Sequence, residues 1–177
     1  MELKLLDLIQ NMTNPLLDFI FLLITSLGNC GIFFIFIGIW LFSWKKTRKI
    51  GLNVLITLLL CGIFGNLILK PLIARPRPFV VKGIFPKINP PKDFSFPSGH
   101  TYSGIGSANS IYFYNKRFGK IIYIIASLVA FSRLYFYVHY PTDIIGGIFL
   151  GLILSYVSKF LTDLIYKKLR QIKKQPK

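Results

Sequence analysis

The chain has 177 residues, enough for one domain, and 53% of them are hydrophobic. Its mean hydropathy of +0.57 is too high for an ordinary water-soluble domain, yet its formal net charge is +16. These facts are compatible because Lys and Arg occupy the loops between long apolar segments. The segregation argues against nucleic acid as the partner and favours membrane lipids or an anionic substrate.

Residues 1–14 predict an amphipathic helix that lies on the membrane surface. Leu5 and Ile9 fall on one helical face, with Lys4 and Asp7 on the opposite face. A frayed N-terminus is the alternative. The segment lacks a basic start and a small-residue cleavage site, so we do not expect a cleaved signal peptide.

The apolar run over residues 16–44 is too long for one membrane span. Gly28 and Gly31 offer a point at which the helix can break. Residues 15–27 also carry Asp18 within the apolar run. We therefore expect this segment to form either a re-entrant helix or a sixth, partial span.

Five segments approach the roughly 17–25 apolar residues that a spanning helix requires. They are residues 28–44, 52–69, 99–114, 121–136 and 142–166. The predicted fold class is all-α, a polytopic membrane helix bundle with five to six transmembrane spans and an N-terminal interfacial or re-entrant helix. Residues 1–177 form a single domain, divided into an interfacial or partial span (1–27), core spans (28–166) and a basic cytoplasmic tail (167–177).

Basic residues in the loops predict the orientation in the membrane. The loops at 45–49 and 116–120 and the tail lie on the same side if each of the five segments crosses once. The positive-inside rule assigns this side to the cytoplasm of a plasma membrane. The opposite side breaks the rule, because the loop over residues 70–98 carries Lys70, Arg75, Arg77, Lys82, Lys87 and Lys92. An anionic ligand is one reason to keep so many cations there.

His139 and Asp143 form one of three motifs on this outer side. Pro141 suits the first turn of the last span, so the four-residue separation brings the carboxylate near the imidazole. A carboxylate on one ring nitrogen fixes the tautomer and leaves the other nitrogen free to attack. A capping Asp beside an interfacial His is the alternative interpretation.

The sequence Pro97-Ser98-Gly99-His100 forms the second motif, at the start of a predicted span. Ser98 is a good N-cap, and Gly99 allows the backbone to approach a ligand closely. The first N–H groups of the helix would then face an anion, and His100 could protonate a leaving oxygen. An ordinary capped helix start is the alternative.

Lys70, Arg77 and Arg133 supply cations at the ends of predicted spans. Three prolines between residues 71 and 78 are expected to prevent a regular helix between the first two cations. Arg133 offers a planar fork that suits phosphate oxygens. Each cation alone could instead extend to the membrane interface, and Arg75 looks like such a case. The small residues of 103–108 predict close helix packing beneath the site.

Taken together, the motifs read Lys-x6-Arg-Pro, Pro-Ser-Gly-His and Ser-Arg-x5-His-x3-Asp, in a setting that covers residues 50–160. This pattern closely resembles the type 2 phosphatidic acid phosphatase family of integral-membrane lipid phosphatases. The resemblance implies that His139 is a nucleophile that forms a phosphohistidine, that Asp143 orients it and that His100 is the acid for the leaving group. It also implies phosphate binding by Lys70, Arg77, Ser98, Gly99 and Arg133.

The resemblance further implies that no metal or other cofactor is needed, and the sequence contains no Cys/His cluster with metal-ligand spacing. The chain departs from a six-span pattern at its N-terminal end, where only one full span precedes residues 52–69. That departure puts the side of lipid entry in doubt. Soluble vanadium haloperoxidases share the motifs, but the five predicted spans argue against that function.

We therefore predict a lipid phosphate or diphosphate phosphatase whose site lies on the extracytoplasmic face. An undecaprenyl-type isoprenoid diphosphate is the favoured substrate, because the resemblance implies that an outward-facing site meets this carrier lipid. Lys82, Lys87 and Lys92, balanced only by Asp93, would also suit a diphosphate. Nonspecific binding of anionic headgroups is the alternative role for these lysines.

Phosphatidylglycerophosphate and phosphatidic acid are the alternative substrates. A different class of function is a non-enzymatic membrane protein that binds or transports anions. Buried charges mark such pathways in membranes. Here the ionisable residues lie at the ends of the predicted spans and not at mid-depth, which favours a surface site.

Overall fold

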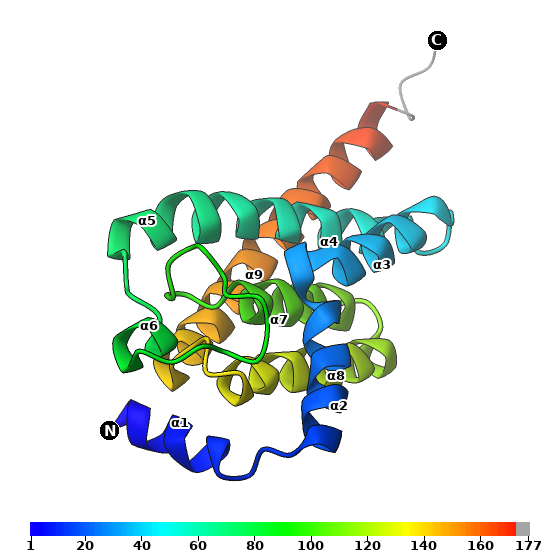
Figure 1. Ribbon diagram of the computed structural model, residues 1–177. Helices are drawn as coiled ribbons and strands as arrows, with labels where there is room; N and C mark the ends of the chain where they lie inside the picture. Colours follow the sequence, from blue (N-terminus) through cyan, green and yellow to red (C-terminus); the bar gives the residue numbers. More distant parts are fainter. Residues whose placement is uncertain (173–177) are drawn as a thin grey trace.

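The computed structural model describes residues 1–172, except for the side chain of Cys30, and the regular structure in this range is entirely helical (Figure 1). The elements in chain order are α1 (Glu2–Gln10), α2 (Pro15–Leu27), the 3-10 turn η1 (Asn29–Gly31), α3 (Ile32–Ser43), α4 (Arg48–Leu60), the π-helical η2 (Cys61–Leu69), α5 (Lys70–Ile73), α6 (Pro78–Lys82), α7 (Gly99–Tyr112), α8 (Lys116–Tyr135) and α9 (Pro141–Ile172). Residues 173–177 of the predicted basic tail lie outside this range.

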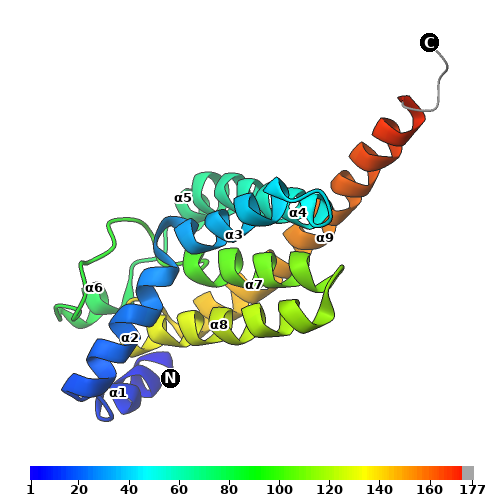
Figure 2. The ribbon, with the colours of Figure 1, turned by 90° about the vertical axis from the view of Figure 1, so that its right-hand side faces the viewer.

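The connections between the long helices gather at two opposite ends of the bundle (Figure 2). One end holds α1, α6 and the loop over residues 83–98. The other end holds the α3–α4 turn, the α7–α8 turn and the projecting C-terminal part of α9 (Figures 1 and 2). The basic loops and the motif-bearing loops are therefore separated along the bundle, as the sequence predicts.

Three helical stretches in the described range are long and apolar enough to cross a membrane, namely Arg48–Lys82, Lys116–Tyr135 and Pro141–Ile172. They contain most of the predicted spans 52–69, 121–136 and 142–166. The predicted break near Gly28 is confirmed, because α2 and α3 meet across η1 at a bend of 48° and make a fourth candidate span only if taken together.

The predicted span 99–114 is a helix, but α7 is too short to be one of these candidate membrane spans. It has 14 residues and lies at the centre of the bundle, where it packs against α4, α8 and α9. Most of its residues are buried by protein. Because α7 faces other helices on all sides, it can carry small and polar residues where a lipid-exposed helix would need large apolar ones.

Glycines bring α7 and α9 into backbone contact, as the small residues of 103–108 predict. A methyl group added to Gly106 would lie 3.2 Å from the carbonyl oxygen of Gly151. One added to Gly151 would lie 2.6 Å from the carbonyl oxygen of Tyr102. Because α7 begins with Gly99-His100 and α9 begins beside Asp143, this contact sets the distance between two of the predicted motifs.

The N-terminal segment forms a helix that packs on the motif-bearing end, so it is not a frayed terminus. Leu6 of α1 is fully buried in a cluster with Phe79, residues 135–138 and Tyr140. Leu5 and Leu8 remain exposed on the outer face of α1. The predicted division of faces is met only in part, because Leu5 is exposed together with Lys4, whereas Ile9 packs with Leu6 against the protein.

We expect Gly151→Ala to lower the thermal unfolding midpoint, because the new methyl group must push α9 away from the backbone of α7. Overpacking of this kind typically costs about 1–3 kcal/mol. Gly62→Ala is the matched control, because a methyl group there meets no atom within 4 Å. Differential scanning fluorimetry of both variants in detergent measures the effect, and equal midpoints would contradict the proposed close contact.

Candidate active site

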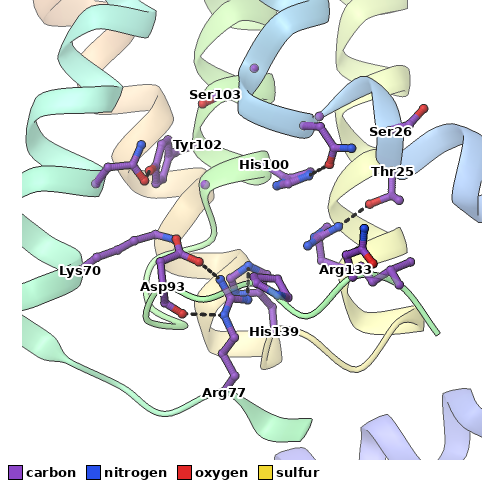
Figure 3. A pocket seen from close by; sticks show the side chains of 18 of the residues that line it. Thr25, Ser26, Lys70, Arg77, Asp93, His100, Tyr102, Ser103, Arg133 and His139 are labelled. Atoms are coloured by element: carbon purple, nitrogen blue, oxygen red, sulfur yellow. Dashed lines mark hydrogen bonds and ion pairs between the residues drawn. The ribbon is translucent and has the colours of Figure 1, made fainter. Parts of the chain in front are cut away.

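A cavity of about 1010 Å³ brings together six of the eight predicted site residues (Figure 3). The residues that line its polar part include Lys70, Arg77, Gly99, His100, Arg133 and His139. Its remaining wall mixes polar and apolar side chains, and the apolar part includes Leu22, Leu23, Ile35 and Leu58 from α2, α3 and α4. The motifs therefore converge in space although they are dispersed along the chain.

His139 presents one ring nitrogen to Asp143 and the other to the cavity. Its Nδ1 lies 3.3 Å from Oδ2 of Asp143, and its Nε2 lies 3.3 Å from Nη1 of Arg77. A carboxylate only accepts hydrogen bonds and a guanidinium only donates them. The proton is therefore on Nδ1, and the lone pair of Nε2 faces the cations.

Asp143 is fully buried behind His139 and does not line the cavity. Pro141 begins α9, so Asp143 lies in the first turn of that helix, as predicted. Its Oδ2 also accepts hydrogen bonds from the Ser95 hydroxyl at 2.5 Å and from the Tyr140 amide at 2.9 Å. These donors fix the carboxylate, which in turn fixes the orientation of the imidazole.

Arg75 does not extend freely to the membrane interface, contrary to the sequence-based interpretation. Its Nη1 donates to Oδ1 of Asp143 at 2.6 Å, and its Nη2 donates to Glu2 at 2.7 Å. The guanidinium also stacks over Tyr140 at 3.8 Å from the ring centroid. Arg75 therefore joins α1 to the carboxylate behind His139. The only sequence signal was its position two residues before Arg77.

Lys70 and Arg77 are both buried and share Asp93 as a partner. Asp93 pairs with Lys70, and its Oδ1 accepts from Nη2 of Arg77 at 2.7 Å (Figure 3). The guanidinium also donates to the Val138 carbonyl at 2.7 Å. The sequence predicted no regular helix between Lys70 and Arg77. This is wrong for the first residues of the segment, because the helix continues through Lys70 to Ile73.

The second and third motifs obtain partners from the N-terminal part of the chain. Arg133 donates a hydrogen bond to Thr25 of α2, and Nε2 of His100 lies 3.2 Å from the side-chain oxygen of Asn29 in η1. Within the described residues, Nε of Arg133 is buried without an acceptor. An unpaired buried donor on a guanidinium is costly unless a ligand satisfies it. Sequence reasoning assigned neither Thr25 nor Asn29 to the site.

Ser98 does not point its hydroxyl into the cavity. The residue is fully buried, its Oγ accepts from the Thr101 hydroxyl at 3.1 Å, and its amide donates to the Asp143 carbonyl at 3.1 Å. It forms no side-chain cap to α7. Gly99 does line the cavity. The first N–H groups of a helix have no intrahelical acceptor, so an anion can bind there.

Two of the three lysines expected to face a diphosphate already have carboxylate partners. Lys82 pairs with Asp7 of α1 and Lys87 pairs with Asp18 of α2. The prediction that Asp93 alone balances these lysines is therefore wrong. Lys92 is exposed. Lys82 thus joins α6 to α1, and Lys87 joins the loop over residues 83–98 to α2.

His139 is held neutral by its surroundings. Burial is the main cause that lowers the pKa of its imidazole from 6.5 to about 3. The hydrogen bond with Asp143 opposes this shift, and the neighbouring Arg77 and Arg133 cations add to it. At neutral pH the Nε2 lone pair is therefore unprotonated. Over residues 1–172 we find no cluster of three or more His, Cys, Asp or Glu side chains that could hold a metal ion.

A model of the PAP2 superfamily matches residues 50–165, a stretch that contains all three motifs. The chain belongs to this superfamily. The resemblance inferred from the motifs is thereby confirmed.

Two curated relatives and one solved structure extend the comparison. The undecaprenyl-diphosphatase BcrC of Bacillus subtilis is 31% identical over 86% of this chain and 78% of its own length. Phosphatidylglycerophosphatase B of the same organism is 35% identical over 77% of this chain and 69% of its own. The crystal structure of a transmembrane PAP2-type phosphatidylglycerolphosphate phosphatase from Bacillus subtilis superposes with a TM-score of 0.72 and 29% identity, covering 93% of this chain and 85% of that one.

We expect the free energy of unfolding to fall as the pH is lowered from about 7.5 to about 5. The pKa of His139 is depressed in the folded state, so the unfolded chain binds more protons between pH 6.5 and about 3. The loss from this group is at most about 1.4 kcal/mol per pH unit. His139→Gln removes the titrating ring and should show a shallower decline in thermal midpoint. The same slope in both proteins would contradict a buried, neutral His139.

Proposed function

We propose that this protein hydrolyses the terminal phosphate of a membrane lipid through a phosphohistidine on His139, with an undecaprenyl-type isoprenoid diphosphate as the substrate. The observation that carries the proposal is the unprotonated Nε2 of His139, which lies in one cavity with the buried cations Lys70, Arg77 and Arg133. These groups match the needs of phosphoryl transfer, which is mainly positioning and charge stabilisation.

In the first step, Nε2 of His139 attacks phosphorus, a P–N bond forms and the bond to the lipid oxygen breaks. His100, in its protonated form, gives its proton to the leaving oxygen. Lys70, Arg77 and Arg133 hold the phosphoryl oxygens, together with the free N–H groups at Gly99. Asp143 stabilises the positive charge that develops on the imidazole.

In the second step, a water molecule replaces His139 on phosphorus. His100 takes a proton from this water, so it returns to its starting form and inorganic phosphate is released. The Arg77 hydrogen bond to Nε2 has to be exchanged for one to a phosphoryl oxygen before attack. Arg77 keeps its place meanwhile, because the Val138 and Asp93 carbonyls also hold its guanidinium.

The apolar part of the cavity supports a lipid as the substrate. Leu22 and Leu23 of α2, Ile35 of α3 and Leu58 of α4 line the same space as the cations. A hydrocarbon chain fits such a wall, and a phosphate held by the cations would then lie at the boundary with water. A soluble phosphate ester would gain nothing from this surface.

The choice of an isoprenoid diphosphate rests on the relatives. BcrC of Bacillus subtilis and a Sulfolobus acidocaldarius relative with 35% identity are both named undecaprenyl-diphosphatases. Phosphatidylglycerophosphatase B is similarly close in sequence, so phosphatidylglycerophosphate is the second candidate. Lys82 and Lys87, because they have carboxylate partners, add little weight to the choice.

We place the site on the extracytoplasmic face of a plasma membrane, with the chain crossing the bilayer several times. The basic α3–α4 and α7–α8 turns lie at the end of the bundle opposite the site (Figure 2). The positive-inside rule favours the cytoplasm for that end. A non-enzymatic anion-binding protein remains a different class of function, and turnover distinguishes it directly.

We expect wild-type protein in detergent to release phosphate from undecaprenyl diphosphate faster than from phosphatidylglycerophosphate or phosphatidic acid, with EDTA present. His139→Ala should lower the rate by more than about 10³-fold, because the nucleophile is lost. His100→Ala should lower it by about 10²–10⁴-fold. Asp163→Asn, in the ion pairs with Lys49 and Lys159, is the control and should be near wild type. Turnover by His139→Ala at the wild-type rate would refute the mechanism.

We expect a cysteine at Phe85 to react with a membrane-impermeant thiol reagent in intact cells, because this loop residue is 95% exposed at the site end. A cysteine at Lys46, in the α3–α4 turn, should react only after permeabilisation. Both variants are made after replacement of the two native cysteines by alanine. The reverse labelling pattern would invert the orientation.

A further inference from the structure

Asp93 occupies the side of the cation pair that a phosphate would approach. One carboxylate oxygen pairs with Lys70, and the other accepts from Nη2 of Arg77 at 2.7 Å (Figure 3). The side chain of Asp93 is 50% exposed, whereas those of Lys70 and Arg77 are 6% and 4% exposed. The carboxylate therefore lies between two buried cations and the solvent.

The arrangement reproduces the way in which two oxygens of one phosphate would be held. Each oxygen of the carboxylate serves one cation, and all three residues line the cavity that contains His139. The pKa of the Asp93 carboxyl is lowered to about 2 by Lys70 and Arg77, despite its partial burial, so it is ionised at neutral pH. A phosphate that binds these cations must compete with a permanent negative charge.

We propose that Asp93 is a specificity determinant, whose carboxylate holds Lys70 and Arg77 until a phosphate group with more than one negative charge displaces it. The inference rests on the proposed lipid phosphatase function. Asp93 would thereby exclude the phosphodiester headgroups of bulk anionic lipids, which carry a single charge. It would admit the terminal phosphate of a diphosphate or a monoester, which carries a charge of about −1.5 to −2 near pH 7.

The physical basis is the charge of the group that lies between Lys70 and Arg77, which is either the Asp93 carboxylate or a phosphate. A diester that replaces the carboxylate exchanges one negative charge for another, so it gains no electrostatic attraction. A phosphate dianion adds a second charge to the cavity. Arg133, whose Nε is buried without an acceptor among the described residues, lines the same cavity. Leu22, Leu23 and Ile35 line the cavity, so the apolar chains of membrane lipids can enter it. In a membrane these lipids are present at high local concentration. Exclusion of the wrong headgroups is therefore useful.

Removal of the Asp93 charge should leave the Arg77 guanidinium in its place. The Arg77 guanidinium is also held by the backbone carbonyls of Val138, Asp93 and Phe94, none of which depends on the side chain of Asp93. Asp93→Asn keeps the size of the side chain and one acceptor oxygen. It is the conservative variant with which to test the proposal.

The experiment measures inhibition of lipid phosphate hydrolysis by phosphatidylglycerol in mixed detergent micelles. We expect Asp93→Asn to lower the inhibition constant of this diester by about tenfold or more, as loss of a competing charged hydrogen bond predicts. Asp7→Asn is the matched control, since it removes the same charge at the same end of the molecule but does not line the cavity. Asp93→Glu keeps the charge and should keep the wild-type inhibition constant.

An unchanged inhibition constant in Asp93→Asn, or an equal change in Asp7→Asn, would overturn the proposal. A calorimetric measurement of inorganic phosphate binding requires no turnover. It therefore tests the role of Asp93 separately from the proposed lipid phosphatase function. Tighter binding to Asp93→Asn than to wild type supports the role of Asp93 even if the wild type hydrolyses no lipid, and equal binding refutes it. If Asp93→Asn does not fold, Asp93→Ser serves in the same comparisons.

Discussion

The burial of three cations beside the apolar part of the bundle is the constraint on which the rest of the structure depends. Lys70, Arg77 and Arg133 are each almost fully buried. A buried cation is costly unless partners surround it. The loop over residues 83–98 supplies Asp93, and the turn before α9 supplies the Val138 carbonyl. Arg133 donates to Thr25 of α2, and its Nε has no acceptor among the described residues, so the site retains capacity for an anion.

The same constraint explains the distribution of acidic residues, which are few in so basic a chain. Of the six Asp and Glu residues, five form ion pairs near the motif-bearing end, namely Glu2, Asp7, Asp18, Asp93 and Asp143. Three of them come from α1 and α2. The N-terminal helices therefore hold the outer loops in place, and through Arg75 they reach the carboxylate behind His139. Part of the basic charge that breaks the positive-inside rule is neutralised locally.

Close packing of α7 against α9 fixes the relative position of the two motifs that lie at the starts of these helices. The glycines at positions 106 and 151 allow the two backbones to touch, and the Ser98 amide donates to the Asp143 carbonyl at 3.1 Å. Buried polar side chains strengthen the contact, since Asn109 donates to Ser155 at 2.8 Å. Hydrogen bonds and small residues are the main means of joining helices where lipid provides no hydrophobic driving force. The start of α7 and the start of α9 are therefore held together.

The sequence by itself determined the helical class, most of the long apolar segments, the break near Gly28 and the family, because each of these depends on local spacing. A four-residue separation places Asp143 beside His139 whatever the rest of the chain does. Only the tertiary structure decided the partners of the cations and the direction of the Ser98 hydroxyl. Arg75 and Glu2 are 73 residues apart, and Lys70 and Asp93 are 23 apart. Such pairs form only after the helices have packed, because packing alone decides which side chains lose water together.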